Sequence, residues 1–173
     1  PETDFDTVDE ISTRQYVNVD VRDAELCPAY FMQAAEVKIE PSPLWMRRRL
    51  HAAGLRGINN IVDVTNYVLL EVGQPMHAFD YKEISDKTIV VRRARKGETI
   101  IPLNEKEYEL DENILVIADK SRPVGLAGVM GGLNSGIKPD TSTVLLEAAE
   151  FNRENIRRTS RRLGIRSDSS ARF

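Results

Sequence analysis

The chain of 173 residues has one cysteine and two histidines, and these shortages exclude two kinds of site. Because Cys27 has no second cysteine to pair with, no disulfide can form within the chain. His51 and His77 do not lie at metal-ligand spacing from Cys27, and no Cys-x-x-Cys pair exists. The sequence therefore predicts no zinc site.

Long apolar runs, interleaved aromatic residues and an excess of one charge are also missing. No apolar run approaches the roughly 18 residues of a membrane span, and no signal-peptide pattern is present, so we expect a cytoplasmic protein without membrane contact. The 24 basic and 27 acidic side chains give a net charge of -3, which would not attract a phosphate backbone. Any contact with nucleic acid must be local or come from neighbouring domains.

The composition favours one domain. With 41% apolar residues the chain can close a single sizeable core. Residues 1–13 are acidic and weakly periodic, so we expect a leader or a linker there and a domain over 14–173. Pro1 cannot be a natural initiator, and Phe173 ends a charged stretch without a helix-stop signal. We therefore expect both ends to be cuts from a longer protein.

Capping signals predict three helices, each beginning near a serine or asparagine and ending before a glycine that can adopt the left-handed conformation. The predicted helices are 44–53 after Ser42 and Pro43 and before Gly54, 59–71 starting at Asn59 or Asn60 and before Gly73, and 152–163 after Asn152 and before Gly164.

Short apolar runs between turn residues predict strands over the remaining chain. The predicted strands are 16–21, 29–39, 89–91, 98–102, 108–110, 114–117, 124–130 and 144–146. Together these elements predict an α+β fold with a mixed or antiparallel sheet and a few packed helices.

Three further features are candidates for chemistry. The glycine-rich block 125–132 fits neither Walker A nor the dinucleotide-binding pattern and is typical of a tight turn or of close backbone packing. Glu147 interrupts an apolar run, so its carboxyl group must either point into solvent or find hydrogen-bond partners. His77 follows Pro75 and Met76 in a predicted turn, where a lone histidine is commonly a hydrogen-bonded loop residue.

The order of these blocks resembles the B3/B4 region of bacterial phenylalanyl-tRNA synthetase β subunits. The matching runs are 60–67, 73–80, the glycine-rich block and 159–168, and the resemblance covers about 25–173. It implies an editing domain that hydrolyses tyrosine wrongly attached to tRNA(Phe).

The resemblance also implies substrate-binding residues. Ala127, Gly128 and Gly131 would line the editing pocket, where the missing side chains let backbone groups approach the ligand. Glu147 would accept a hydrogen bond from the phenol hydroxyl of tyrosine. A site that bonds this hydroxyl can reject phenylalanine by about 10⁴- to 10⁵-fold. Ser167 and Ser169 border the pocket at positions where many members carry threonine and alanine.

The implied catalytic residues are His77, Thr65 and Asn66, which would position a water molecule and stabilise the developing oxyanion. Covalent catalysis is not expected, because the sequence has no Ser-His-Asp order with an elbow motif and Cys27 has no evident base partner.

The family works as an α2β2 assembly in which ATP and magnesium serve aminoacylation elsewhere, so no cofactor is implied for this region. The implied partners are the α subunit, the tRNA(Phe) acceptor end and tyrosine.

A second reading is a non-catalytic RNA-docking or subunit-interaction module, and a third is a small-molecule binder outside a synthetase. The six arginines of 152–166 fit either a solvated helix face or a phosphate or subunit contact.

Overall fold

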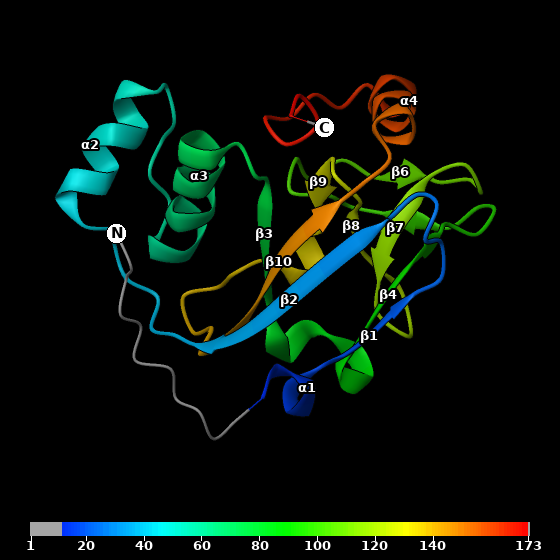
Figure 1. The fold of residues 1–173 in the computed structure, drawn as a ribbon, viewed down its shortest axis with the longest axis horizontal. Helices are drawn as coiled ribbons and strands as arrows, with labels where there is room; N and C mark the ends of the chain where they lie inside the picture. The colour runs from blue at the N-terminus through cyan, green and yellow to red at the C-terminus, as the bar shows by residue number, and fades with distance from the viewer. Residues whose placement is uncertain (1–11, 173) are drawn as a thin grey trace.

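A computed structural model describes residues 12–172, which form two main sheets with helices around them (Figure 1). The helices are α1 (Thr13–Tyr16), α2 (Leu44–Ala52), α3 (Asn60–Val72) and α4 (Arg153–Leu163). The strands are β1 (Asn18–Val21), β2 (Ala29–Glu36), β3 (Met76–Asp80), β4 (Thr88–Arg93), β5 (Thr99–Ile100), β6 (Tyr108–Glu109), β7 (Leu115–Ala118), β8 (Pro123–Leu126), β9 (Met130–Gly131) and β10 (Thr143–Glu150).

The larger sheet has the strand order β1-β4-β7-β8-β9, and the smaller has the order β2-β10-β3. Strands β1 and β4 are parallel, whereas the other pairs in these sheets are antiparallel. Strands β5 and β6 form a separate ribbon. The predicted α+β class with a mixed sheet is therefore confirmed.

The register of β10 sets the inner face of the smaller sheet. Glu147 lies opposite Met32 of β2 on one side and opposite His77 of β3 on the other. Because side chains alternate along a strand, Leu145 and Ala149 point to the same side as Glu147. This side faces the larger sheet.

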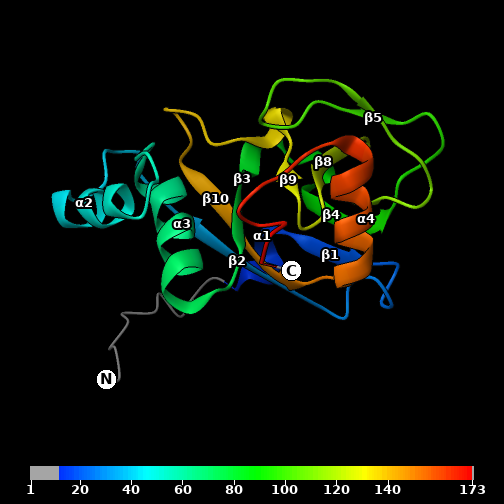
Figure 2. The ribbon, with the colours of Figure 1, turned by 90° about the horizontal axis from the view of Figure 1, so that it is seen from above.

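The hydrophobic core fills the space between the two sheets. Leu145 and Phe79 of the smaller sheet join a single buried cluster with Ile117 and Leu126 of the larger one. Ile156 of α4 is 1% exposed and belongs to the same cluster. The last helix is thus anchored over one end of the core, as Figure 2 shows from above.

All three predicted helices are confirmed, within one residue at most ends. Gly54, Gly73 and Gly164 have φ angles of 84°, 78° and 66°, so each takes the left-handed conformation expected after a helix. The predicted capping role of Ser42 is wrong. Pro43 occupies the N-cap position of α2, and the Ser42 hydroxyl instead donates to the Asp63 carboxyl group.

Three strand predictions need correction. Tyr16 ends the short helix α1 and does not begin a strand. His77 lies within β3 and not in a turn. The predicted strand 124–130 is the hairpin β8–β9, because Gly128 takes a φ of 66° and the Val129 N–H closes a turn onto the Leu126 carbonyl.

Most of the expected leader at 1–13 lies outside the described residues, and Thr13 already belongs to α1. The Thr13 hydroxyl oxygen accepts a hydrogen bond from the Ala34 N–H of β2. No helix between residues 12 and 172 has the length and apolar character needed to cross a membrane.

The Asp63 carboxyl group connects the loop before α2 to α3, and its loss should destabilise the fold. It is 1% exposed and accepts from the Ser42 hydroxyl at 2.5 Å and the Ile58 N–H at 2.8 Å. We expect Asp63→Ala to lower the free energy of unfolding by about 3 kcal/mol, because both donors lose their acceptor. Urea denaturation checks this, with exposed Asp140→Ala as the control. Equal losses in the two variants would contradict it.

Candidate functional site

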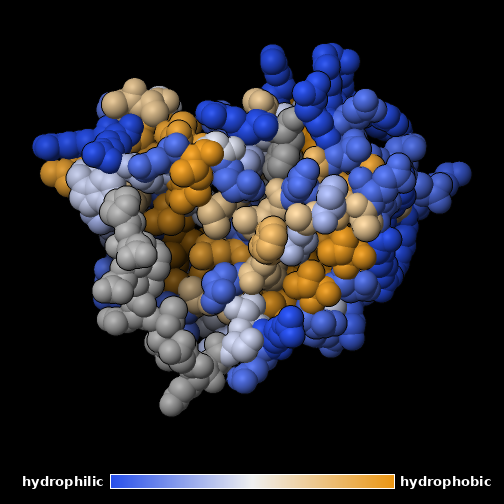
Figure 3. All heavy atoms as spheres, viewed as in Figure 1, coloured by the Kyte–Doolittle hydropathy of each residue, from blue (hydrophilic) through white to orange (hydrophobic). Residues whose placement is uncertain are grey.

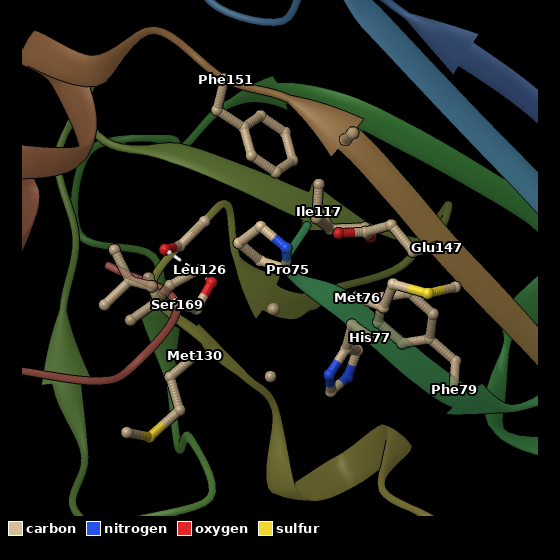
Figure 4. A pocket seen from close by; sticks show the side chains of 15 residues that line it. Pro75, Met76, His77, Phe79, Ile117, Leu126, Met130, Glu147, Phe151 and Ser169 are labelled. Carbon is tan, nitrogen blue, oxygen red and sulfur yellow. Dashed lines mark hydrogen bonds between the residues drawn. The ribbon is translucent and has the colours of Figure 1, made fainter. Parts of the chain in front are cut away.

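A cavity of about 80 Å³ lies between the smaller sheet and the β8–β9 hairpin (Figure 4). A buried water needs roughly 10–15 Å³ by a comparable measure, so the cavity has room for several water molecules or one end of a larger ligand. The side chains and glycines that line it are Pro75, Met76, His77, Phe79, Ile117, Gly125, Leu126, Gly128, Val129, Met130, Gly131, Glu147, Ala149, Phe151 and Ser169. Most of this lining is apolar.

Glu147 is the one carboxyl group in the cavity lining within the described chain, and it is 7% exposed. Burial raises the pKa of Glu147 to about 7, because the charged form loses its hydration. The Tyr30 hydroxyl donates to Glu147 Oε2 at 2.6 Å, which lowers this pKa and partly opposes the effect of burial. Near neutral pH the carboxyl group therefore exchanges readily between its charged and neutral forms.

His77 lies on β3 directly opposite Glu147, beside Phe79 (Figure 4). Its imidazole meets the Phe79 ring edge-on, with 4.5 Å between ring centroids. Burial lowers the pKa of His77 to about 4, so the ring is neutral at physiological pH. Its Nε2 atom is buried and has no hydrogen-bond partner among residues 12–172. A neutral imidazole has one donor and one acceptor nitrogen, so it is suited to hold a water or a ligand hydroxyl.

The absence of a side chain at Gly131 makes room for His77. A Cβ atom at Gly131 would lie 2.1 Å from His77 Cε1, a distance that atoms cannot share without movement. The imidazole therefore packs directly against the backbone of β9. Here glycine is required by close approach and not by a positive φ angle.

The chain after α4 closes one side of the cavity. The Ser169 hydroxyl donates to the Gly128 carbonyl at 3.2 Å, and the Ser167 hydroxyl donates to the Val129 carbonyl at 2.6 Å. These bonds fix the tail, residues 165–172, against the hairpin loop. Ser169 lines the cavity, whereas Ser167 lies on the other side of the tail.

The site suits recognition and water-mediated chemistry better than covalent catalysis. Burial raises the pKa of the Cys27 thiol to about 12, so it forms little thiolate at neutral pH. The Ser169 hydroxyl already donates to the Gly128 carbonyl, which is not the geometry of an activated nucleophile. No group of three or more potential metal ligands occurs within the described part of the chain.

The family model described as the B3/4 domain matches residues 26–173. The chain belongs to the B3/4 domain family. It is 51% identical over 158 residues to a phenylalanine–tRNA ligase β subunit of Carboxydothermus hydrogenoformans, covering 91% of this chain and 20% of that protein. It is 45% identical over 174 residues to the β subunit of Clostridium tetani, covering 100% of this chain and 22% of that protein. This B3/4 chain thus spans about a fifth of the length of these relatives.

A solved structure supports the fold of this B3/4 domain. The crystal structure of an N-terminal fragment of the phenylalanyl-tRNA synthetase β subunit from Pyrococcus horikoshii matches with a TM-score of 0.54. The match covers 80% of this chain and 44% of that one, at 15% identity. At this identity the likeness concerns the fold.

The B3/4 domain brings five of the nine predicted site residues together around the cavity. These are His77, Gly128, Gly131, Glu147 and Ser169.

The other four predicted residues lie outside the cavity lining. Ala127 is 2% exposed and its N–H donates to the Leu115 carbonyl. Ser167 holds the tail as described above. Thr65 and Asn66 lie on α3, where the Thr65 hydroxyl donates to the Val62 carbonyl at 2.8 Å. Their catalytic roles stay predictions.

Sequence reasoning missed Tyr30, the partner of Glu147. Tyr30 lies on β2, in the same alternating set as Met32, and so on the inner face of the smaller sheet. The alternation indicated only that these residues share a face. The pairing of β2 with β10 was needed to show which carboxyl group Tyr30 meets.

The raised pKa of Glu147 predicts a pH-dependent stability. Folding favours the neutral form of the Glu147 carboxyl group. The stability gained from this preference is fully present below pH 4.5 and is lost as the pH rises to about 7. Relative to Glu147→Gln, the wild-type free energy of unfolding should fall by about 3 kcal/mol across this window. His77, whose pKa is lowered, acts in the opposite direction but equally in both proteins. Urea denaturation at several pH values checks this, and parallel pH curves would contradict it.

Filling the space at Gly131 should displace His77. We expect Gly131→Ala to cost about 1–3 kcal/mol of unfolding free energy through overpacking and to shift the His77 ring resonances in NMR spectra. Gly136→Ala is the matched control, because its Cβ would meet Leu103 at an ordinary 3.6 Å. Unchanged His77 resonances in Gly131→Ala would show that the close packing does not hold the ring.

Proposed function

We propose that this B3/4 domain is an editing domain that hydrolyses the ester of tyrosine wrongly attached to tRNA(Phe). The observation that carries the proposal is the buried Glu147 carboxyl group in a largely apolar cavity. The relatives in Carboxydothermus hydrogenoformans and Clostridium tetani are phenylalanine–tRNA ligase β subunits, which supports a substrate charged by such an enzyme. The partners of the whole protein would then be an α subunit in an α2β2 assembly and the tRNA acceptor end.

Glu147 provides the selectivity in this proposal. The error to be removed differs from the correct product by one phenol hydroxyl on an otherwise apolar ring. A buried carboxyl group that bonds this hydroxyl recovers part of its desolvation cost only with tyrosine. Tyr30 bonds one oxygen of Glu147, and phenylalanine would bring no donor to the other, so correctly charged tRNA would be spared.

His77 provides the water-positioning group. Its pKa of about 4 makes it a weak base, so it orients a water and does not hold a proton at neutral pH. The neutral ring keeps one nitrogen without a proton, and that nitrogen accepts from the water. Backbone groups of the glycine hairpin are close enough to the cavity to contact the ester end. We assign no step to Thr65 or Asn66, because neither lines the cavity.

The cavity also limits how the substrate enters. A volume of about 80 Å³ takes the phenol end of tyrosine, displacing water, so that the ester bond lies at the mouth of the cavity beside the glycine hairpin and the RNA remains outside. The apolar walls, including Phe151 and Ile117, fit the aromatic ring. This arrangement demands a binding surface for RNA beside the cavity.

Deacylation assays test the proposal with a full-length β subunit carrying this sequence, assembled with its α subunit. The wild type should hydrolyse Tyr-tRNA(Phe) in preference to Phe-tRNA(Phe). Glu147→Ala should reduce this preference by about 10- to 100-fold, the value of a hydrogen bond to a charged group. His77→Ala should lower kcat by about 100-fold and leave the preference largely intact.

Matched controls are Glu150→Gln, an exposed carboxylate on the same strand, and His51→Ala, an exposed histidine on α2. Both should behave as wild type. Equal loss of rate and preference in Glu147→Ala and His77→Ala would contradict the separate roles. A wild-type enzyme that does not distinguish the two charged tRNAs would overturn the proposed function.

A further inference from the structure

The C-terminal helix carries a row of arginines that the cavity chemistry does not use. Arg157 and Arg161 are spaced four residues apart on α4, and Ser160 and Gly164 complete the same stripe. The neighbouring stripe of this helix, which includes Ile156 and Thr159, is buried in the core. The packing of this buried stripe fixes the rotation of α4, and so it also fixes the direction in which the arginine stripe faces.

This stripe forms one wall of a groove of about 520 Å³, and the tail forms the other. The groove is lined by Arg157, Ser160, Arg161, Gly164, Arg166, Ser167, Ser170 and Ala171. Three of these residues are arginines and none is acidic. Figure 3 shows hydrophilic side chains projecting over α4 and the C-terminal end of the chain.

The three groove arginines are not neutralised within the described residues. Arg162, on another side of α4, pairs with Asp111, but Arg157, Arg161 and Arg166 form no ion pair between residues 12 and 172. Like charges four residues apart on a helix repel each other and lower its stability. In a chain of net charge -3, such a cluster points to an anionic ligand.

The groove and the cavity share the tail as a common wall. Ser167 lines the groove and Ser169 lines the cavity, and the two residues are held to the same hairpin loop. An extended chain advances at most about 3.3–3.6 Å per residue, so Ser167 in the groove and Ser169 in the cavity are at most about 7 Å apart along the backbone. If one end of a ligand fills the cavity and the rest is a polyanion, the charged part would reach the groove arginines.

We propose that this groove binds the phosphodiester backbone of the single-stranded RNA end that carries the amino acid. The inference rests on the proposed function, because it places the RNA that leaves the cavity. Arginine guanidinium groups bind phosphate oxygens through two parallel hydrogen bonds. The groove presents two such groups on α4 and one on the tail, which is hydrogen-bonded to the hairpin loop. The small aromatic content of the chain fits backbone contacts without base stacking.

Kinetics on two substrates test the groove in the full-length enzyme with its α subunit. The first substrate is Tyr-tRNA(Phe), and the second is 3′-O-tyrosyl-adenosine, which has no phosphodiester. For the tRNA we expect the double variant Arg157→Gln/Arg161→Gln to raise KM about tenfold at constant kcat. The slope of log KM against log salt concentration should weaken by about 0.7 for each phosphate group that the variant no longer binds. Hydrolysis of tyrosyl-adenosine should not change.

Arg158→Gln is the matched control, because Arg158 is an exposed arginine of α4 that does not line the groove. It should behave as wild type on both substrates. A wild-type KM and salt slope in the double variant would overturn the proposal. Equal reductions in activity on both substrates, or failure of the subunits to assemble, would also overturn it and assign the stripe to protein contact.

A separate experiment keeps the groove testable if the wild type hydrolyses neither substrate. In that case the proposed function fails, and a photoreactive oligoribonucleotide ending in CCA is crosslinked to the full-length enzyme. Crosslinks within 157–171 that disappear in the double variant would support the groove. Their absence from the wild type would overturn it.

Discussion

The antiparallel register of β10 between β2 and β3 is the constraint on which the site depends. It places Glu147 opposite His77 and brings the Tyr30 hydroxyl to the same carboxyl group. A slip of one residue would turn Glu147 away from the larger sheet and would remove Leu145 from the core. The apolar residues that alternate with Glu147 therefore protect the register of the site, because any slip also costs core burial.

Burial shifts the pKa values of the two titratable groups in the cavity in opposite directions, each toward the neutral form. The pKa of Glu147 rises to about 7 and that of His77 falls to about 4. An ion pair between them is thus disfavoured, which leaves both groups available to a neutral ligand. Tyr30 satisfies one oxygen of Glu147 and limits the cost of burying it.

The glycine hairpin and the C-terminal tail join this cavity to the surface. Gly131 lets β9 pack against His77, while Gly128 reverses the chain and offers its carbonyl to Ser169. The same tail forms one wall of the arginine groove. A small ligand end and a charged extension can thus be held by adjoining parts of one domain, although the chain as a whole is slightly acidic.

Sequence determined much of this protein by local rules. Helices 44–53, 59–71 and 152–163 followed from capping residues and glycines, because these act within a few residues of chain. The B3/4 motifs also indicated His77, Gly128, Gly131, Glu147 and Ser169, which all line the cavity.

Only the tertiary structure decided whether Glu147 faced solvent or the core, that Tyr30 is its partner, and that Thr65 and Asn66 lie outside the cavity lining. These facts depend on strand pairing between segments more than 60 residues apart along the chain, such as β3 and β10. A local pattern gives the face of a strand but not its neighbour, because register is set by the packing of the whole core.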